Sequence, residues 1–154
     1  MLGTYITFPE LLIWLPLLAG VACFFAKKEQ AAKAIALLGS LLVLSVSIVT
    51  LFYTDNTQYS SYNQVNYFWL KYIGNSFNIG LDGYGRMLTF LTALSFPIIF
   101  LATYRNTYKR SSVFYGLMLL TQCGLMGVFC AKDALLFYFF WELALIPVYF
   151  LCSI

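Results

Sequence analysis

Histidine is absent from this chain, and charged residues are scarce. The 154 residues contain no histidine, which excludes bis-histidine haem and histidine-containing zinc or copper sites within them. Only 10% of the residues are charged, whereas a soluble domain carries about 25%. The net charge of +3 comes from basic residues in short loops beside apolar runs. This arrangement is typical of a membrane protein and not of a protein that binds nucleic acid.

Cysteine pairs and glycine-rich loops are also lacking. No Cys-x-x-Cys motif occurs, and every cysteine lies inside an apolar run, as small packing residues do: Cys23, Cys123, Cys130 and Cys152. No glycine-rich nucleotide-binding loop follows a predicted strand. We therefore expect the chain to hold no disulfide framework, metal or redox cofactor, and to carry no electrons itself.

Apolar sequence is abundant, because 62% of the residues are hydrophobic. Five apolar runs predict membrane-spanning helices at residues 11–26, 31–53, 84–104, 112–130 and 134–154. A spanning segment must satisfy its own backbone, so runs of this length favour helices over a barrel. The predicted fold class is all-α: one transmembrane domain over residues 1–154, built as a polytopic bundle of about five helices.

One long polar connection separates the second and third runs. Within it, residues 65–73 are aromatic and rich in strand-forming residues, residues 74–76 suit a turn, and residues 77–81 suit a second short strand. Tyrosine, tryptophan and phenylalanine favour the membrane–water interface. We expect a small extramembrane β-hairpin that lies on the membrane surface.

Glu142 is the one ionisable residue in the last apolar run. It lies about 12 Å along a helix from Ala134, near the middle of a hydrocarbon core roughly 30 Å thick. A carboxylate there costs about 2.5–3.5 kcal/mol on insertion scales, and acids inside membranes usually mark ion or proton paths. Pro147 loosens the helix nearby, and the phenols of Tyr138 and Tyr149 share the face of the acid. We expect Glu142 to transfer protons; the alternative is a structural acid that only hydrogen-bonds a neighbouring helix.

Three charged residues at helix ends are secondary candidates for a proton path. Asp82 and Arg86 are four residues apart at the start of the third run, where a helix cap with an ion pair is the blander interpretation. Lys132 and Asp133 form a minimal turn before the last run, where anchoring and capping are the default roles.

Two further features stand inside the third and fourth runs. Pro97 has no N–H, so it leaves the carbonyl of Ala93 without a helical donor; such a break marks either a transport site or a packing kink. Gln122 is the strongest polar group of the fourth run, and we expect it to hydrogen-bond across helices.

The distribution of basic residues predicts the orientation. Positive charge favours the cytoplasmic side of a membrane. The first and third connections hold six basic residues and the other side holds three: Lys27, Lys28, Lys33, Arg105, Lys109 and Arg110 against Lys71, Arg86 and Lys132. We expect the amino terminus to lie outside and Lys33 to reach back to the interface.

Three stretches resemble one known family. One stretch runs from Phe139 to Phe150, with the sequence FFWELALIPVYF. It closely resembles the fifth helix of the antiporter-like M subunit of respiratory complex I, which is called subunit 4 of NADH dehydrogenase in mitochondria. The stretch from Phe77 to Gly83 is similar to the entrance of that family's third helix, and Leu11 to Leu17 to its first. The resemblance runs through the whole chain in order.

The resemblance implies a function that the residues alone do not. It implies a membrane-arm subunit of a proton-translocating NADH:quinone oxidoreductase in the cell inner (plasma) membrane, with Glu142 as the family's fifth-helix acid, normally paired with a lysine on a later helix. NADH, FMN, iron–sulfur clusters and quinone would bind in partner subunits. The partners would be other membrane-arm subunits and the lipid bilayer.

The chain departs from that family in length. The family has about fourteen helices and this sequence has five, so we expect an amino-terminal part of a larger subunit, with any charged partner of Glu142 outside these residues. Two alternatives remain. One is a subunit of a multisubunit cation/proton antiporter or membrane-bound hydrogenase, and the other is a purely structural membrane subunit.

Overall fold

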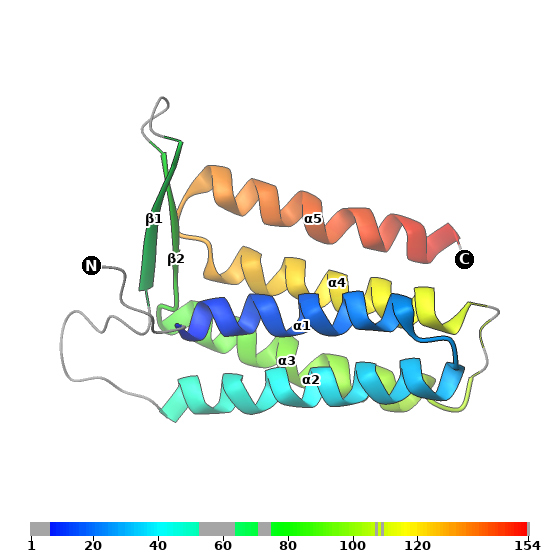
Figure 1. The fold of residues 1–154 in the computed structure, drawn as a ribbon. Helices are drawn as coiled ribbons and strands as arrows, with labels where there is room; N and C mark the ends of the chain where they lie inside the picture. The colour runs from blue at the N-terminus through cyan, green and yellow to red at the C-terminus, as the bar shows by residue number, and fades with distance from the viewer. Residues whose placement is uncertain (1–6, 53–63, 71–74, 107, 109, 154) are drawn as a thin grey trace.

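Five helices lie side by side and form a bundle, with a β-hairpin across one end (Figure 1). A computed structural model describes residues 7–52, 64–70, 75–106, 108 and 110–153. The helices are α1 (Phe8–Phe25), α2 (Glu29–Phe52), α3 (Gly83–Thr103), α4 (Ser111–Cys130) and α5 (Ala134–Ser153). All five are long and apolar enough to cross a membrane. The expected bundle of membrane-spanning helices is confirmed.

The first helix begins three residues earlier than the apolar run suggested. Thr7 is its N-cap, and both the backbone N–H and the hydroxyl of Thr7 donate to Oε2 of Glu10, at 2.9 Å each. This capping box satisfies donors at the helix start, so a polar turn joins the apolar run. The signal, a threonine followed three residues later by a glutamate, is present in the sequence.

The hairpin joins β1 (Gln64–Leu70) and β2 (Asn75–Gly80) as antiparallel strands. The expected hairpin is confirmed, but its second strand begins at Asn75 rather than Phe77. Asn75 and Ser76 pair with β1 across an irregularity between Phe68 and Leu70, so these two residues belong to the strand and not to the turn. The remainder of the predicted turn lies outside the described residues.

The hairpin is tied to the bundle at the connection between α4 and α5. Ile79 forms a β-bridge with Ala131, and the backbone N–H of Lys132 donates to the carbonyl of Asn78 at 3.0 Å. Ile79 is almost fully buried in the core cluster that contains residues of α1, α2, α3, α4 and α5. The β2 strand therefore closes one end of the bundle.

Helix α4 is the centre of the bundle and contacts each of the other four helices. Its glycines allow close approach. A Cβ atom on Gly124 would lie 2.7 Å from backbone atoms of Ala144 in α5, and one on Gly127 would overlap the ring of Phe140. On the other side, Gly20 of α1 lies against the carbonyl of Gly116.

Lys33 holds two helices together at the end opposite the hairpin. Its side chain is buried, and Nζ donates to the carbonyls of Tyr104 (2.8 Å) and Asn106 (3.0 Å) while pairing with Oε1 of Glu29 (2.8 Å). The expectation that Lys33 reaches back to the membrane interface stays a prediction. The carbonyls that follow the end of α3 have no helical donors, and the ammonium group satisfies two of them.

Candidate functional site

Helix α5 packs through a single narrow stripe. Its buried residues are Leu136, Phe140, Ala144 and Pro147, spaced three or four apart, as one helical face requires. This face meets the glycines of α4. Pro147 lies on the buried stripe inside a helix that continues to Ser153, so it does not divide α5 in two. Most other side chains of α5 are exposed.

Glu142 lies on the exposed part of α5, near the middle of the helix. Tyr138, one turn earlier, lies close enough to interact electrostatically with its carboxylate, so one of the two phenols expected on this face accompanies the acid. The other phenol, Tyr149, is 74% exposed. The five helices thus place a carboxylate and a phenol together on a surface that faces away from α4, near the middle of a helix long enough to span a membrane.

The three secondary candidates for a proton path, Asp82, Lys132 and Asp133, lie at the end of the bundle that carries the hairpin. They do not contact Glu142. Oδ1 of Asp82 accepts from the N–H of Gly85 at 2.7 Å, so the predicted cap of α3 is confirmed; its ion pair with Arg86 stays a prediction. The aliphatic part of the Lys132 side chain lies over Gly80.

Asp133 lies at the start of α5, where its Oδ1 accepts from the N–H of Leu135 at 3.3 Å. Nine residues separate it from Glu142, a rise of about 13 Å along the helix. A direct proton transfer between the two carboxylates is excluded at that distance. Asp133 therefore acts as a capping group in this structure, as the default interpretation of its turn predicted.

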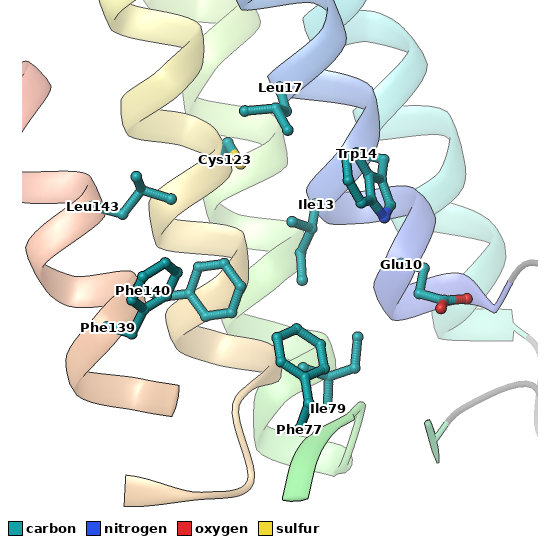
Figure 2. A pocket seen from close by; sticks show the side chains of 10 residues that line it. All are labelled: Glu10, Ile13, Trp14, Leu17, Phe77, Ile79, Cys123, Phe139, Phe140 and Leu143. Atoms are coloured by element: carbon teal, nitrogen blue, oxygen red, sulfur yellow. The ribbon is translucent and has the colours of Figure 1, made fainter. Parts of the chain in front are cut away.

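A separate apolar groove of about 590 Å³ runs between α1 and α5 (Figure 2). Cys123 of α4 forms its floor, Ile13 and Leu143 face it from the two sides, and Phe77 of β2 closes its end. Glu10, at the rim, is the one charged residue among those that line it. The groove suits an apolar group and offers no acid–base chemistry. Sequence reasoning missed it because four elements build it.

Two polar groups inside the bundle have no hydrogen-bond partner. Both amide atoms of Gln122 and the hydroxyl of Ser47 are fully buried and unpaired. The predicted hydrogen bond of Gln122 to another helix is therefore wrong as a direct contact. Unpaired buried polar groups are uncommon in membrane proteins because the surrounding hydrocarbon offers no alternative partner.

Comparison with known proteins gives a consistent group of relatives. No family model matches the chain. The chain is 36% identical to NADH-quinone oxidoreductase subunit M of Buchnera aphidicola over 94% of its residues and 30% of that protein. It is 33% identical to F(420)H(2) dehydrogenase subunit M of Methanosarcina mazei, over 94% of this chain and 29% of that one. NAD(P)H-quinone oxidoreductase chain 4 3 of Trichormus variabilis is 35% identical, with 97% and 28% covered.

A solved structure shows the same arrangement of helices. A chain of respiratory complex I from Thermus thermophilus with bound NADH superposes with a TM-score of 0.70 at 30% identity, over 89% of this chain and 27% of that chain. The chain spans about three tenths of the length of the curated relatives that it matches. By sequence and by fold, these 154 residues are homologous to part of the M, or chain 4, subunits of NADH-quinone oxidoreductases.

Proposed function

We propose that this chain forms part of a membrane-arm subunit of a proton-translocating NADH:quinone oxidoreductase, in which Glu142 takes up and releases a proton. The observation that carries the proposal is a carboxylate at the middle of a membrane-spanning helix, in a chain homologous to subunit M over nearly its whole length. The exposed position of the acid agrees with the proposal, because the partner lysine implied by the family lies on a later helix.

The exposed face of α5 is the surface on which such later helices would pack. Glu142 and Tyr138 lie there together, beside exposed Trp141 and Leu145. A carboxylate that meets only acyl chains is costly, whereas a lysine and water from an adjoining helix would stabilise its charged form. Covering this face would bury the acid and give it a route for protons.

The electron donor is set by other subunits under this proposal. The relatives carry the names of three kinds of dehydrogenase, using NADH, NAD(P)H and F(420)H(2), yet this chain matches their M or chain 4 subunits at similar identity. Nothing in the described residues groups histidine, cysteine or carboxylate side chains as a metal site. Under this proposal, NADH, FMN, iron–sulfur clusters and quinone would bind in partner subunits of the membrane-bound complex.

The orientation also belongs to the proposal. The connections α1–α2 and α3–α4 lie at one end of the bundle, and the hairpin and the α4–α5 turn lie at the other (Figure 1). The excess of lysine and arginine at the first end would place it in the cytoplasm, with the amino terminus outside. The chain would then be a multi-pass protein of the cell inner membrane.

The test is Glu142→Gln in the complete enzyme, with the ratio of protons moved to electrons transferred measured in sealed vesicles. We expect at least a tenfold loss of proton translocation, because an amide cannot exchange a proton near neutral pH. Glu10→Gln is the matched control, because glutamine preserves the capping box. Normal translocation in Glu142→Gln would overturn the proposal, and equal losses in both variants would show a general effect of removing acids.

A further inference from the structure

Gln122 is a buried polar residue to which the proposed function gives no role. It lies in the middle of α4 and is fully buried, and among the residues that the structure describes neither its Nε2 nor its Oε1 has a hydrogen-bond partner. It lies on a different face of α4 from Gly124 and Gly127, which meet α5. The partner of this amide must therefore be sought between α2, α3 and α4, away from Glu142.

The register of α3 against α4 identifies what lies opposite Gln122. The rings of Phe100 and Tyr115 pack with centroids 5.8 Å apart, and seven residues inward from that pair the antiparallel helices bring Ala93 level with Gln122. At the other end, a Cβ on Gly85 would lie 2.9 Å from the carbonyl oxygen of Phe129, which gives the same register within one residue. Ala93 is fully buried, so its backbone faces the interior of the bundle.

The carbonyl of Ala93 lacks its helical donor. Pro97 occupies the position four residues later inside α3, and proline has no N–H. Helix α3 continues to Thr103 past this point, so the freed carbonyl lies within a continuous helix, beside buried Ala93 and Pro97. Freed carbonyls in membrane helices are commonly satisfied by a neighbouring side chain or an ordered water.

Ser47 of α2 is a second unpaired polar group, but it lies away from this level. A Cβ on Gly39 would contact Leu119, which places Val43 level with Cys123, since α2 and α4 run in the same direction. Ser47 follows Val43 by one turn, about 7 Å along the helix axis from the level of Gln122. The groups that share a level are therefore the amide of Gln122 and the carbonyl of Ala93.

We infer that Gln122 and the carbonyl of Ala93 form a binding site for ordered water in the middle of the bundle. Water suits the site because Nε2 needs an acceptor while the carbonyl and Oε1 need donors, and a water molecule offers both. A cation would leave Nε2 unpaired. The water joins α3 and α4, and it secures the Pro97 break in α3 against α4.

Stability measurements on the 154-residue chain in bilayer nanodiscs distinguish a water-binding Gln122 from a Gln122 that has no hydrogen-bond partner. Gln122→Met keeps the volume and removes the polar atoms. If Gln122 binds water, the unfolding equilibrium constant rises about fivefold, because the carbonyl of Ala93 loses its bridge to α4. If Gln122 is simply unpaired, its removal lowers that constant, which would overturn the inference. Gln30→Met, at an exposed position of the same bundle, is the matched control.

The same substitution in a Pro97→Ala variant tests whether Gln122 and the carbonyl of Ala93 share one water. Pro97→Ala restores an N–H that can donate to the carbonyl of Ala93. Gln122→Met should then change the unfolding constant by only about twofold, since the two positions share one interaction. Equal effects of Gln122→Met with proline and with alanine at position 97 would contradict a shared water.

The wild-type chain gives a direct measurement of the contact between Gln122 and water. In a sample with ¹⁵N-labelled glutamine, the side-chain amide of Gln122 should exchange magnetisation with water while remaining protected from a soluble paramagnetic agent. Single replacement of each glutamine identifies the signal. An amide that shows no contact with water, or one that bonds directly to a protein carbonyl, would overturn the inference.

Discussion

Helices α4 and α5 have the same length and nearly the same mean hydropathy, yet one is mostly buried in the bundle and the other is mostly exposed. Each has 20 residues, and their mean hydropathies are 1.7 and 1.9. In their most apolar windows, 61% of the residues of α4 are buried against 22% of those of α5. Hydropathy therefore makes both helices span a membrane and does not decide which becomes the core.

Side-chain size and the placement of polar atoms account for the difference. The glycines of α4 let α1 and α5 approach its backbone, and its one strong polar residue, Gln122, is enclosed. Helix α5 has large aromatic residues on most of its surface and carries Glu142 on the exposed part. A polar group in α4 thus acts within the bundle, whereas the acid of α5 is presented outward.

The largest effect on stability should come from a large side chain at the glycine of α4 that lies against α5. Gly124→Leu would drive a side chain into the backbone of Ala144, which cannot rotate away. We expect a loss of about 3 kcal/mol in the free energy of unfolding, the upper range for overpacking. Gly83→Leu is the control, because a Cβ there meets nothing within 4 Å. Equal stabilities of the two variants would show that α4 and α5 are not packed as described.

A smaller loss of stability is expected from removing the charge of Lys33, at the end of the bundle away from the hairpin. Lys33→Met removes the charged donor for the carbonyls of Tyr104 and Asn106 and leaves Glu29 unpaired. We expect a loss of about 2 kcal/mol in nanodiscs, since hydrogen bonds to charged groups exceed neutral ones. Lys27→Met, at an exposed position of the same end, should change the unfolding free energy little. Equal losses in the two variants would contradict the buried clamp.

The contact between α3 and α4 should contribute still less. Tyr115 donates its hydroxyl to the carbonyl of Thr103 at 3.2 Å and is almost fully buried. Tyr115→Phe should cost about 1 kcal/mol, the typical value for one neutral hydrogen bond. Tyr84→Phe, which alters an 85% exposed side chain, should leave the unfolding free energy unchanged. The reverse order of the two effects would show a wrong register between these helices.

The smallest effect on stability is expected for the acid itself. Glu142→Gln should change the unfolding free energy of the 154-residue chain by no more than about 0.5 kcal/mol, because the side chain is exposed and contacts mainly Tyr138. The measurement is the same unfolding assay in nanodiscs. A loss above about 1 kcal/mol would indicate a structural acid and would remove the contrast between α4 and α5.

Much of the fold follows from the sequence, because long apolar runs leave a membrane protein few alternatives. The five helices begin and end within three residues of the expected positions, and the largest difference arises from the capping box at Thr7. The strand boundary at Asn75 was harder to predict, since asparagine and serine are typical turn residues and only pairing with β1 places them in a strand.

The candidate site was only partly predictable. Local spacing places Tyr138 beside Glu142, because residues four apart share a helical face. The outward position of Glu142 depends on where the glycines of α4 meet α5, which is tertiary information. The same limit applies to Gln122, whose expected partner on another helix is absent in the described structure. The partners of Lys33 were unpredictable for a related reason, because they come from two separate segments.

Protonation of Glu142 during turnover is the most direct test of the account. Difference infrared spectroscopy of the complete enzyme, with ¹³C-labelled glutamate, can follow the carboxyl stretch of an acid as quinone is reduced. The account predicts a carboxyl band that appears and disappears with turnover, that shifts with the label and that is missing in Glu142→Gln. Active translocation by the wild-type enzyme with no such change at Glu142 would contradict it.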